Sequence, residues 1–183
     1  MDADVPAPRM LPRLIAGLML TGAASTAEAI GGADIEAMML SYLAKFPQFV
    51  EWPEAQLPPP GGAFNFCVLG DEDLTAIAAT VGQQKAQQRP FNVVDGKRRG
   101  SLTDCHILYL GHSEGWRVKT MLASVQSHPV LTISDIDGFA GQGGIIDFVV
   151  QDHHLKFEIN LKAAAKAGLH INAQLASLAV KVY

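Results

Sequence analysis

The chain contains 183 residues, of which 49% are hydrophobic and 17% are charged, and its net charge is -4. This length and composition indicate one compact domain and exclude a disordered or fibrous chain. The longest basic run, Lys97-Arg98-Arg99, is too short to provide the positive field that binding of a nucleic-acid backbone requires, so we expect no nucleic-acid partner.

The first 29 residues have the features of a secretory signal peptide. Arg9 and Arg13 precede an apolar run over residues 14–24, and Ala27-Glu28-Ala29 forms a small-x-small cleavage site. An apolar run of this length is too short to cross a bilayer, which takes about 20 residues. We therefore predict that residues 1–29 are removed during export, with no membrane insertion. The alternatives are an uncleaved anchor and a buried N-terminal helix.

The residues ahead of this basic and apolar segment are acidic, which is unusual at the start of a signal peptide. Met10 would begin a more typical one, so both Met1 and Met10 stand as starts of translation. With either start, the mature part of the chain is residues 30–183, which we expect to form one α/β domain.

The first predicted element of the mature chain is a helix over residues 33–46, where apolar side chains recur at three- and four-residue spacings. Prolines follow this segment and end the helix. Strands are then expected over residues 64–69, 91–94, 105–110 and 130–134, and helices over residues 71–81 and 116–125. The alternation predicts an α/β fold with a mostly parallel or mixed sheet that helices flank on both faces.

The segment GFAGQGGIIDFV, residues 138–149, contains four glycines within seven residues. Their spacing matches neither GxGxxG nor GxxxxGK[ST], and strand-forming residues follow them, whereas a phosphate-binding loop leads into a helix. We therefore expect these glycines to provide positive φ angles or a bulge where the chain turns between two strands.

The last third of the chain is predicted to contain an antiparallel hairpin at the end of the sheet. Its strands, over residues 145–150 and 155–161, flank the polar tetrapeptide QDHH. Asn160 can cap the helix that follows, and Gly168 would end that helix. Two helices complete the chain, over residues 161–167 and 172–180.

The turn after the strand at residues 130–134 is the candidate site for a ligand or for a protein interaction. α/β domains often bind ligands just beyond the carboxyl ends of parallel strands. Capping of the turn is the alternative role of its aspartates. The candidate residues are Asp135, Asp137, Phe139, Gly141, Gly143 and Gly144. On this basis, a periplasmic small-molecule-binding module is one hypothesis for the function.

Catalytic chemistry has one candidate, the segment GHSEG at residues 111–115, which fits the GxSxG pattern of hydrolases with Ser113 as nucleophile. The residues nominated to complete a triad are Asp135 or Asp137 with His153, His154 or His170. The mature chain is too short for an α/β-hydrolase sheet, so a hydrolase is the less favoured alternative, and we expect a protein that is not an enzyme. Cys105 and His106 point to opposite faces of a strand and cannot form a nucleophilic pair.

The six histidines include no HxxxH or HxH pair, so we predict no metal site and no cofactor. The two cysteines, Cys67 and Cys105, would be exported to an oxidising compartment, where an even number of cysteines favours pairing. Two buried free thiols are the alternative, because spacing in the sequence does not show that the two side chains meet.

Five segments that follow one another along the mature chain resemble the YfiR family of periplasmic regulators. They are KFPQFVEWP at residues 45–53, FCVLGDEDL at 66–74, CHILYLG at 105–111, PVLTISDIDGFAGQGGIIDFV at 129–149 and LKFEINLKAAAKAGLHINAQLASLA at 155–179. The resemblance covers nearly the whole mature chain, and its segments together are far more specific than any one of them.

The resemblance implies an exported, non-catalytic regulator with an α/β fold, often a homodimer. Such a regulator would bind the periplasmic domain of a membrane diguanylate cyclase of the YfiN type and hold it inactive, which lowers cyclic-di-GMP and biofilm output. An outer-membrane lipoprotein of the YfiB type would relieve the inhibition by capturing the regulator.

The resemblance also implies a disulfide between Cys67 and Cys105, which match the cysteine pair that the family carries on neighbouring strands. Family members can carry a second pair in or near the glycine-rich loop. Residues 138–147 of this chain contain no cysteine, so redox control through a second pair is not expected here.

Overall fold

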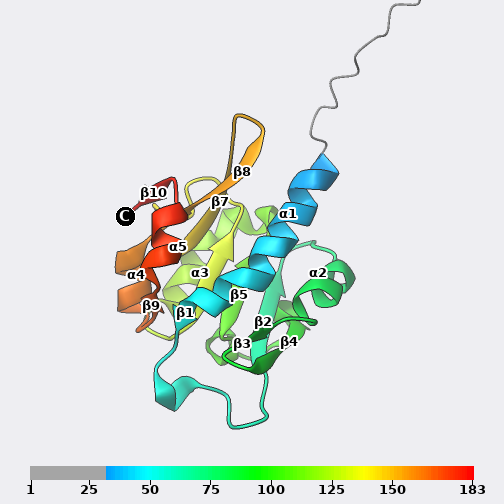
Figure 1. Ribbon diagram of the computed structural model, residues 1–183, viewed down its shortest axis with the longest axis vertical. Coiled ribbons are helices and arrows are strands. Elements are labelled where there is room, and N and C mark those ends of the chain that lie inside the picture. The colour runs from blue at the N-terminus through cyan, green and yellow to red at the C-terminus, as the bar shows by residue number, and fades with distance from the viewer. Residues whose placement is uncertain (1–31) are drawn as a thin grey trace, which may run out of the picture.

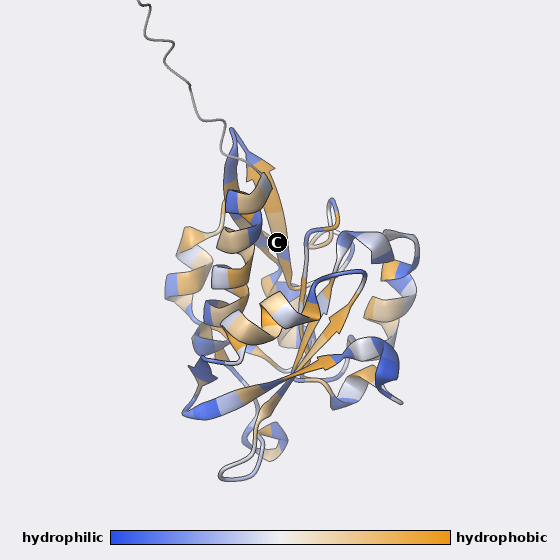
Figure 2. Cartoon of the chain, turned by 90° about the vertical axis from the view of Figure 1, so that its right-hand side faces the viewer, coloured by the Kyte–Doolittle hydropathy of each residue, from blue (hydrophilic) through white to orange (hydrophobic). Residues whose placement is uncertain are grey.

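The computed structural model describes residues 32–183 (Figure 1). The predicted signal peptide, residues 1–29, and both candidate start residues lie outside the described residues. The described chain forms one α/β domain, with a sheet at its centre and helices around it. Figure 2 shows that the strands at the centre of the molecule are its most continuously hydrophobic part.

Eight strands form one mixed sheet in the order β10-β8-β7-β6-β5-β2-β4-β3. These strands are β2 (Phe64–Leu69), β3 (Lys85–Ala86), β4 (Arg89–Asp95), β5 (Ile107–Leu110), β6 (Leu131–Ser134), β7 (Ile146–Gln151), β8 (His154–Ile159) and β10 (Lys181–Val182). Two further short strands, β1 (Val50–Glu51) and β9 (His170–Ile171), pair antiparallel beside it.

Five neighbouring strands of the sheet, β4, β2, β5, β6 and β7, all run parallel. Numbered along the chain, they lie in the order 2-1-3-4-5, which is one of the two common orders of doubly wound α/β folds. β7 and β8 form the predicted antiparallel hairpin, with Ile146 opposite Ile159 and Gln151 opposite His154. The predicted fold class, including this hairpin, is confirmed.

Helices cover both faces of the sheet, with α1 crossing in front of the strands and α3 behind them in the view of Figure 1. The helices are α1 (Gly32–Lys45), α2 (Leu74–Val81), α3 (Val118–Val125), α4 (Leu161–Lys166) and α5 (Ala173–Leu178). Short 3-10 helices are η1 (Phe46–Phe49), η2 (Glu54–Gln56), η3 (Gly96–Arg98), η4 (Leu102–Asp104) and η5 (His112–Arg117).

Polar side chains fix where three of these helices begin, because each accepts hydrogen bonds from backbone N–H groups that the first helical turn leaves free. Asp73 accepts from Thr75 at 2.8 Å at the start of α2. Asn160 accepts from Ala163 at 2.8 Å at the start of α4, as predicted. Asn172 plays the same part for α5.

The core divides into two clusters, one on each face of the sheet, because successive side chains of a strand point to opposite faces. In β2, Phe64 and Phe66 belong to the larger cluster with α1 and α2. Cys67 and Leu69 belong to the smaller cluster, which contains α3 and the side chain of Phe139. The apolar residues of the strands are therefore buried on both sides, as the continuous apolar run CHILYL indicates.

Short elements differ from the sequence predictions. The last helix ends at Leu178 instead of residue 180, and β10 follows it as the edge strand of the sheet. There Val180 donates its N–H to Phe157 O at 2.9 Å. The segment predicted as a helix over residues 116–125 begins as η5 and becomes α-helical at Val118. β1, β3 and β9 were not predicted, because strands of two residues are too short to show a period.

Candidate functional site

The carboxyl edge of the parallel strands contains a switch point, where the strands that follow β2 along the chain lie on its two sides. β4 lies on one side of β2 and β5 on the other, so the loops after β2 and β5 separate from one another there. Asp71, after β2, donates its N–H to Ser113 Oγ, after β5, at 3.2 Å. In doubly wound folds this is the usual place for a ligand.

A cavity of about 150 Å³ lies at this edge, between α1, α2 and the ends of β5 and β6. Four carboxylates line it, Glu36 from α1, Glu72 and Asp73 before α2 and Asp135 after β6, together with the buried ring of Tyr109. Asp135 thus reaches a cavity at the carboxyl end of its strand, as the sequence predicts for a candidate ligand residue.

We name this cavity the acidic crevice. Burial and the repulsion between its carboxylates raise the pKa values of several of the side chains that line it. Burial raises the pKa of Glu72, and the charge of Asp135 raises it further. Burial also raises the pKa of Asp135, and burial with the charge of Asp135 raises the pKa of Tyr109. Carboxylates in a crevice repel phosphate groups. The strand order is one that often binds nucleotides, but the side chains of this crevice do not suit a nucleotide.

The glycines of the segment 138–144 turn the backbone and make room for an aromatic ring. Gly138 and Gly143 have φ angles of +69° and +104°, a region that side chains rarely allow. The ring of Phe139 is fully buried in the smaller core cluster, and a Cβ atom on Gly144 would collide with it. The prediction of positive φ angles is confirmed.

The buried end of this glycine loop is fastened to β7 and to the start of α4. Asp147 is fully buried and accepts the N–H of Ala140 at 3.2 Å. Asn160 donates its side-chain N–H to the carbonyl of Ala140 at 2.8 Å. Burial is the main reason why the pKa of Asp147 is raised to about 6.

The six residues proposed from the sequence therefore do not form one site. Asp135 lines the acidic crevice, whereas Phe139 and Gly144 are buried in the core. Asp137, Gly141 and Gly143 are exposed on the glycine loop. The contacts by which Asp147 and Asn160 hold this loop were missed, because only the tertiary structure brings β7 and the start of α4 to residue 140.

The GxSxG segment begins at Gly111, immediately after β5, and continues into η5, where its serine is exposed. Ser113 Oγ accepts the N–H of Asp71, as described above, and no hydrogen bond within residues 32–183 joins Ser113 to a histidine. His153 and His154 lie at the tip of the β7–β8 hairpin and His170 lies in β9, two different regions of the fold. Within the same described residues, no group of three or more metal-ligating side chains is arranged to hold a metal ion.

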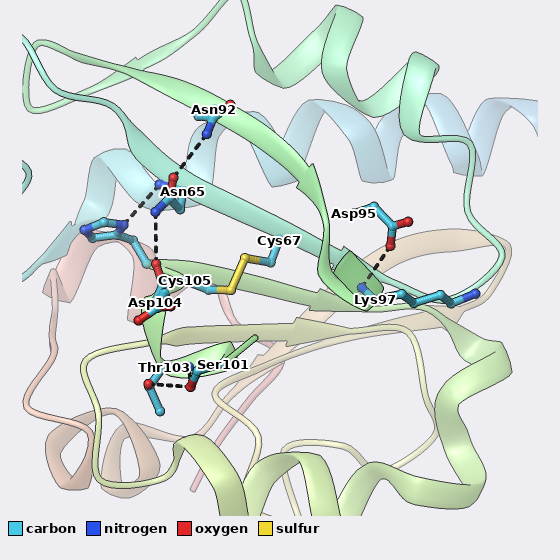
Figure 3. Close-up of a disulfide and its surroundings, with 10 residues drawn as sticks. Asn65, Cys67, Asn92, Asp95, Lys97, Ser101, Thr103, Asp104 and Cys105 are labelled. Carbon is cyan, nitrogen blue, oxygen red and sulfur yellow. Dashed lines mark hydrogen bonds between the residues drawn. A yellow bond between two sulfur atoms is a disulfide. The ribbon is translucent and has the colours of Figure 1, made fainter. Parts of the chain in front are cut away.

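Cys67 and Cys105 form a disulfide, which confirms the predicted pairing (Figure 3). The bond links β2 to the residue that precedes β5 by two positions, with the Cα atoms 5.9 Å apart. Nearby, Asn65 donates its N–H to His106 Nδ1 at 3.0 Å and its side-chain amide to Asp104 O at 3.0 Å. Burial lowers the pKa of His106, in keeping with a neutral ring that accepts a hydrogen bond.

An exposed tryptophan was not identified from the sequence. The side chain of Trp116 on η5 is 83% exposed, and the Arg117 guanidinium lies 5.4 Å from the centre of its ring. Arg117 also forms an ion pair with the buried carboxylate of Glu114. Trp116 lies between a glycine and an arginine, so its neighbours in the sequence do not place it in an apolar segment. That polar surrounding was the only sequence feature that could have indicated exposure.

These features define a class: a doubly wound α/β domain with a buried disulfide, an acidic crevice at its switch point and an exposed aromatic side chain near it. The model of the YfiR/HmsC-like family matches residues 36–180. The chain therefore belongs to the YfiR/HmsC-like family, a regulatory, non-catalytic family of periplasmic proteins that act in diguanylate cyclase signalling.

The disulfide fits the oxidising compartment in which the family is found. In the described part of the chain, none of the helices has the length and apolar character needed to cross a membrane.

Proposed function

We propose that this protein binds the periplasmic domain of a membrane diguanylate cyclase and holds the cyclase inactive, which lowers cyclic-di-GMP and biofilm output. The observation that carries the proposal is the family match over residues 36–180. The proposal includes release of the cyclase when an outer-membrane lipoprotein of the YfiB type captures the regulator. It also includes a homodimer as the active form.

Trp116 and Arg117 form the best contact surface for the cyclase. Tryptophan and arginine are the residues that most often dominate the energy of protein interfaces. Here the ring is free to be covered, while Glu114 holds the guanidinium beside it. Fixing these side chains before binding reduces the entropy that the complex would lose.

The test uses the full-length gene, a deletion strain and two matched variants. Trp116→Ala removes the proposed contact, and Leu178→Ala removes another exposed apolar side chain, 65% exposed on α5. We expect cellular cyclic-di-GMP to rise on deletion, and wild type and Leu178→Ala to restore it, whereas Trp116→Ala does not. Tagged wild type should capture a GGDEF-containing membrane protein. Unchanged cyclic-di-GMP on deletion, with no membrane partner captured, would contradict the proposal.

We also propose that residues 1–29 are a signal peptide that is cleaved to leave a domain of residues 30–183. The basic and apolar pattern with its small-x-small site supports this. Intact mass measurement of the periplasmic protein should give an N-terminus at Ile30. A mature protein that retains residues 14–24 would contradict it.

A further inference from the structure

A mainly apolar cavity lies away from the acidic crevice. It has a volume of about 340 Å³ and lies between α3 and α4, with Tyr183 beside β10 at its wall. It shares no lining residue with the acidic crevice. Its volume is within the usual range of small-molecule sites, roughly 300 to 1,000 Å³.

The floor of this cavity, which we name the α3–α4 pocket, is apolar. Leu122 and Val125 of α3, Val130 before β6 and Ile145 before β7 line it, and all four are buried in the domain. An apolar floor stabilises a ligand in proportion to the apolar surface that the ligand removes from water. The floor by itself therefore favours a ligand with a hydrophobic body.

The rim of the pocket is positively charged. Lys162 and Lys166 lie one turn apart on α4, so their side chains project from the same side of that helix. Lys166 Nζ donates to Oε1 of Gln126, the residue that follows α3, at 2.8 Å, and this hydrogen bond joins the ends of the two helices. No Asp or Glu lines the pocket, and within residues 32–183 neither lysine forms an ion pair with a carboxylate.

We infer that the α3–α4 pocket binds a small amphipathic anion, with its hydrophobic body on the apolar floor and its carboxylate beside Lys162 and Lys166. A neutral apolar ligand would leave the two ammonium groups without a counter-charge. Inorganic phosphate would gain nothing from the floor. Only a molecule with both parts uses the whole pocket.

The pocket also touches the glycine loop, because Gly143 and Asn160 are among its lining residues. An occupant therefore contacts the segment that Asn160 holds through Ala140. Asp135 lies in the acidic crevice, so substitution of Asp135 leaves this binding unchanged. The inference does not depend on the proposed inhibition of a cyclase, since it concerns a ligand that the isolated protein binds.

Isothermal titration calorimetry of the protein purified from the periplasm tests the inference, with decanoate as the probe below its micellar concentration. Decyltrimethylammonium has the same chain with the opposite charge and serves as the ligand control. We expect one decanoate site per chain and binding of the cation at least about ten-fold weaker, because the rim repels it.

Two variants locate the site. Lys162→Gln with Lys166→Gln removes the rim charge and should weaken decanoate binding by roughly five- to twenty-fold. Ala163→Leu, at a half-buried position of α4, narrows the pocket and should reduce binding of every chain-bearing ligand. The matched control, Lys45→Gln with Lys119→Gln, removes two exposed lysines that do not line the pocket.

Circular dichroism confirms that each variant is folded. The inference is overturned if folded wild type does not bind decanoate, or if decanoate and the cation bind equally. It is also overturned if the rim variant and the control variant lose the same affinity.

Discussion

The carboxylate of Asp147 accepts the N–H of Ala140 at 3.2 Å inside the domain, and this contact fastens the glycine loop to β7. Within the described residues, the other oxygen of Asp147, Oδ1, is buried without a hydrogen-bond partner. A charged carboxylate with one unsatisfied oxygen is costly to bury, which is why the pKa of this group is raised to about 6.

Asp147→Asn should therefore make the protein more stable at neutral pH. Because the folded pKa is above the unfolded one, the stability that Asp147 contributes is complete below about pH 4 and is lost as pH rises through 6. Asparagine keeps the acceptor and cannot ionise. We expect the free energy of unfolding of Asp147→Asn at pH 7.5 to exceed that of wild type by roughly 1 to 3 kcal/mol.

Urea unfolding of both proteins at pH 4, 5, 6 and 7.5 measures the effect. The gain should shrink steadily toward pH 4. Asp137→Asn, on the exposed part of the same loop, is the control and should change little. A difference that stays constant across this range would show that the ionisation of Asp147 does not matter.

His106 should give a pH dependence in the opposite direction. Its pKa is lowered by burial, so the unfolded chain binds the proton more readily than the folded one. Stability from His106 is complete above about pH 6.5 and falls as pH decreases. In His106→Asn, which retains an acceptor for the Asn65 N–H, we expect a shallower loss of stability between pH 6.5 and 5, measured by thermal unfolding. An unchanged slope would contradict this role.

The disulfide should contribute strongly to stability, because its cysteines are 38 residues apart and a long loop loses much entropy when it is closed. The chain-entropy relation gives about 4 kcal/mol for a loop of this length. We expect Cys67→Ala with Cys105→Ala to lose up to this amount in urea unfolding. Dithiothreitol should lower the stability of wild type and leave the double variant unaffected, and an equal response of both would rule the bond out as the cause.

Gly144→Ala should destabilise the fold, since the added Cβ atom would meet the buried ring of Phe139. Overfilling a packed core costs about 1 to 3 kcal/mol. Gly141→Ala is the control on the same loop, because its Cβ would lie 3.4 Å or more from the nearest atoms. Thermal unfolding should separate the two variants by several degrees. Equal melting temperatures would mean that the ring moves away without cost.

Much of the fold follows from local patterns in the sequence. The largely apolar segment at residues 64–69 and the acidic residues before α2 gave both elements close to their observed positions, and Asn160 marked the start of α4. The hairpin followed from alternation around a polar turn. These features depend on neighbours within a few residues, so the sequence displays them directly.

The site was less predictable, because its residues meet only through the order of the strands. Nothing local indicates that Glu72 and Asp135 share a crevice, or that Phe139 turns inward while Asp137 stays outside. The exposure of Trp116 is likewise a property of the surface as a whole. The sequence does not indicate that the lysines of α4 line a pocket, because the apolar floor of that pocket comes from α3 and from the residues that precede β6 and β7.

The position of the disulfide along the chain also bears on the order in which the domain assembles. Under the export proposed above, which would start from the N-terminus, Cys105 would enter the oxidising compartment ahead of β6, β7 and β8. A disulfide oxidase can therefore join β2 to β5 while the hairpin is still being translocated. The later strands would then add in turn beyond β5, whose position beside β2 the disulfide already fixes. The rate of disulfide formation would therefore contribute to the folding rate in the cell.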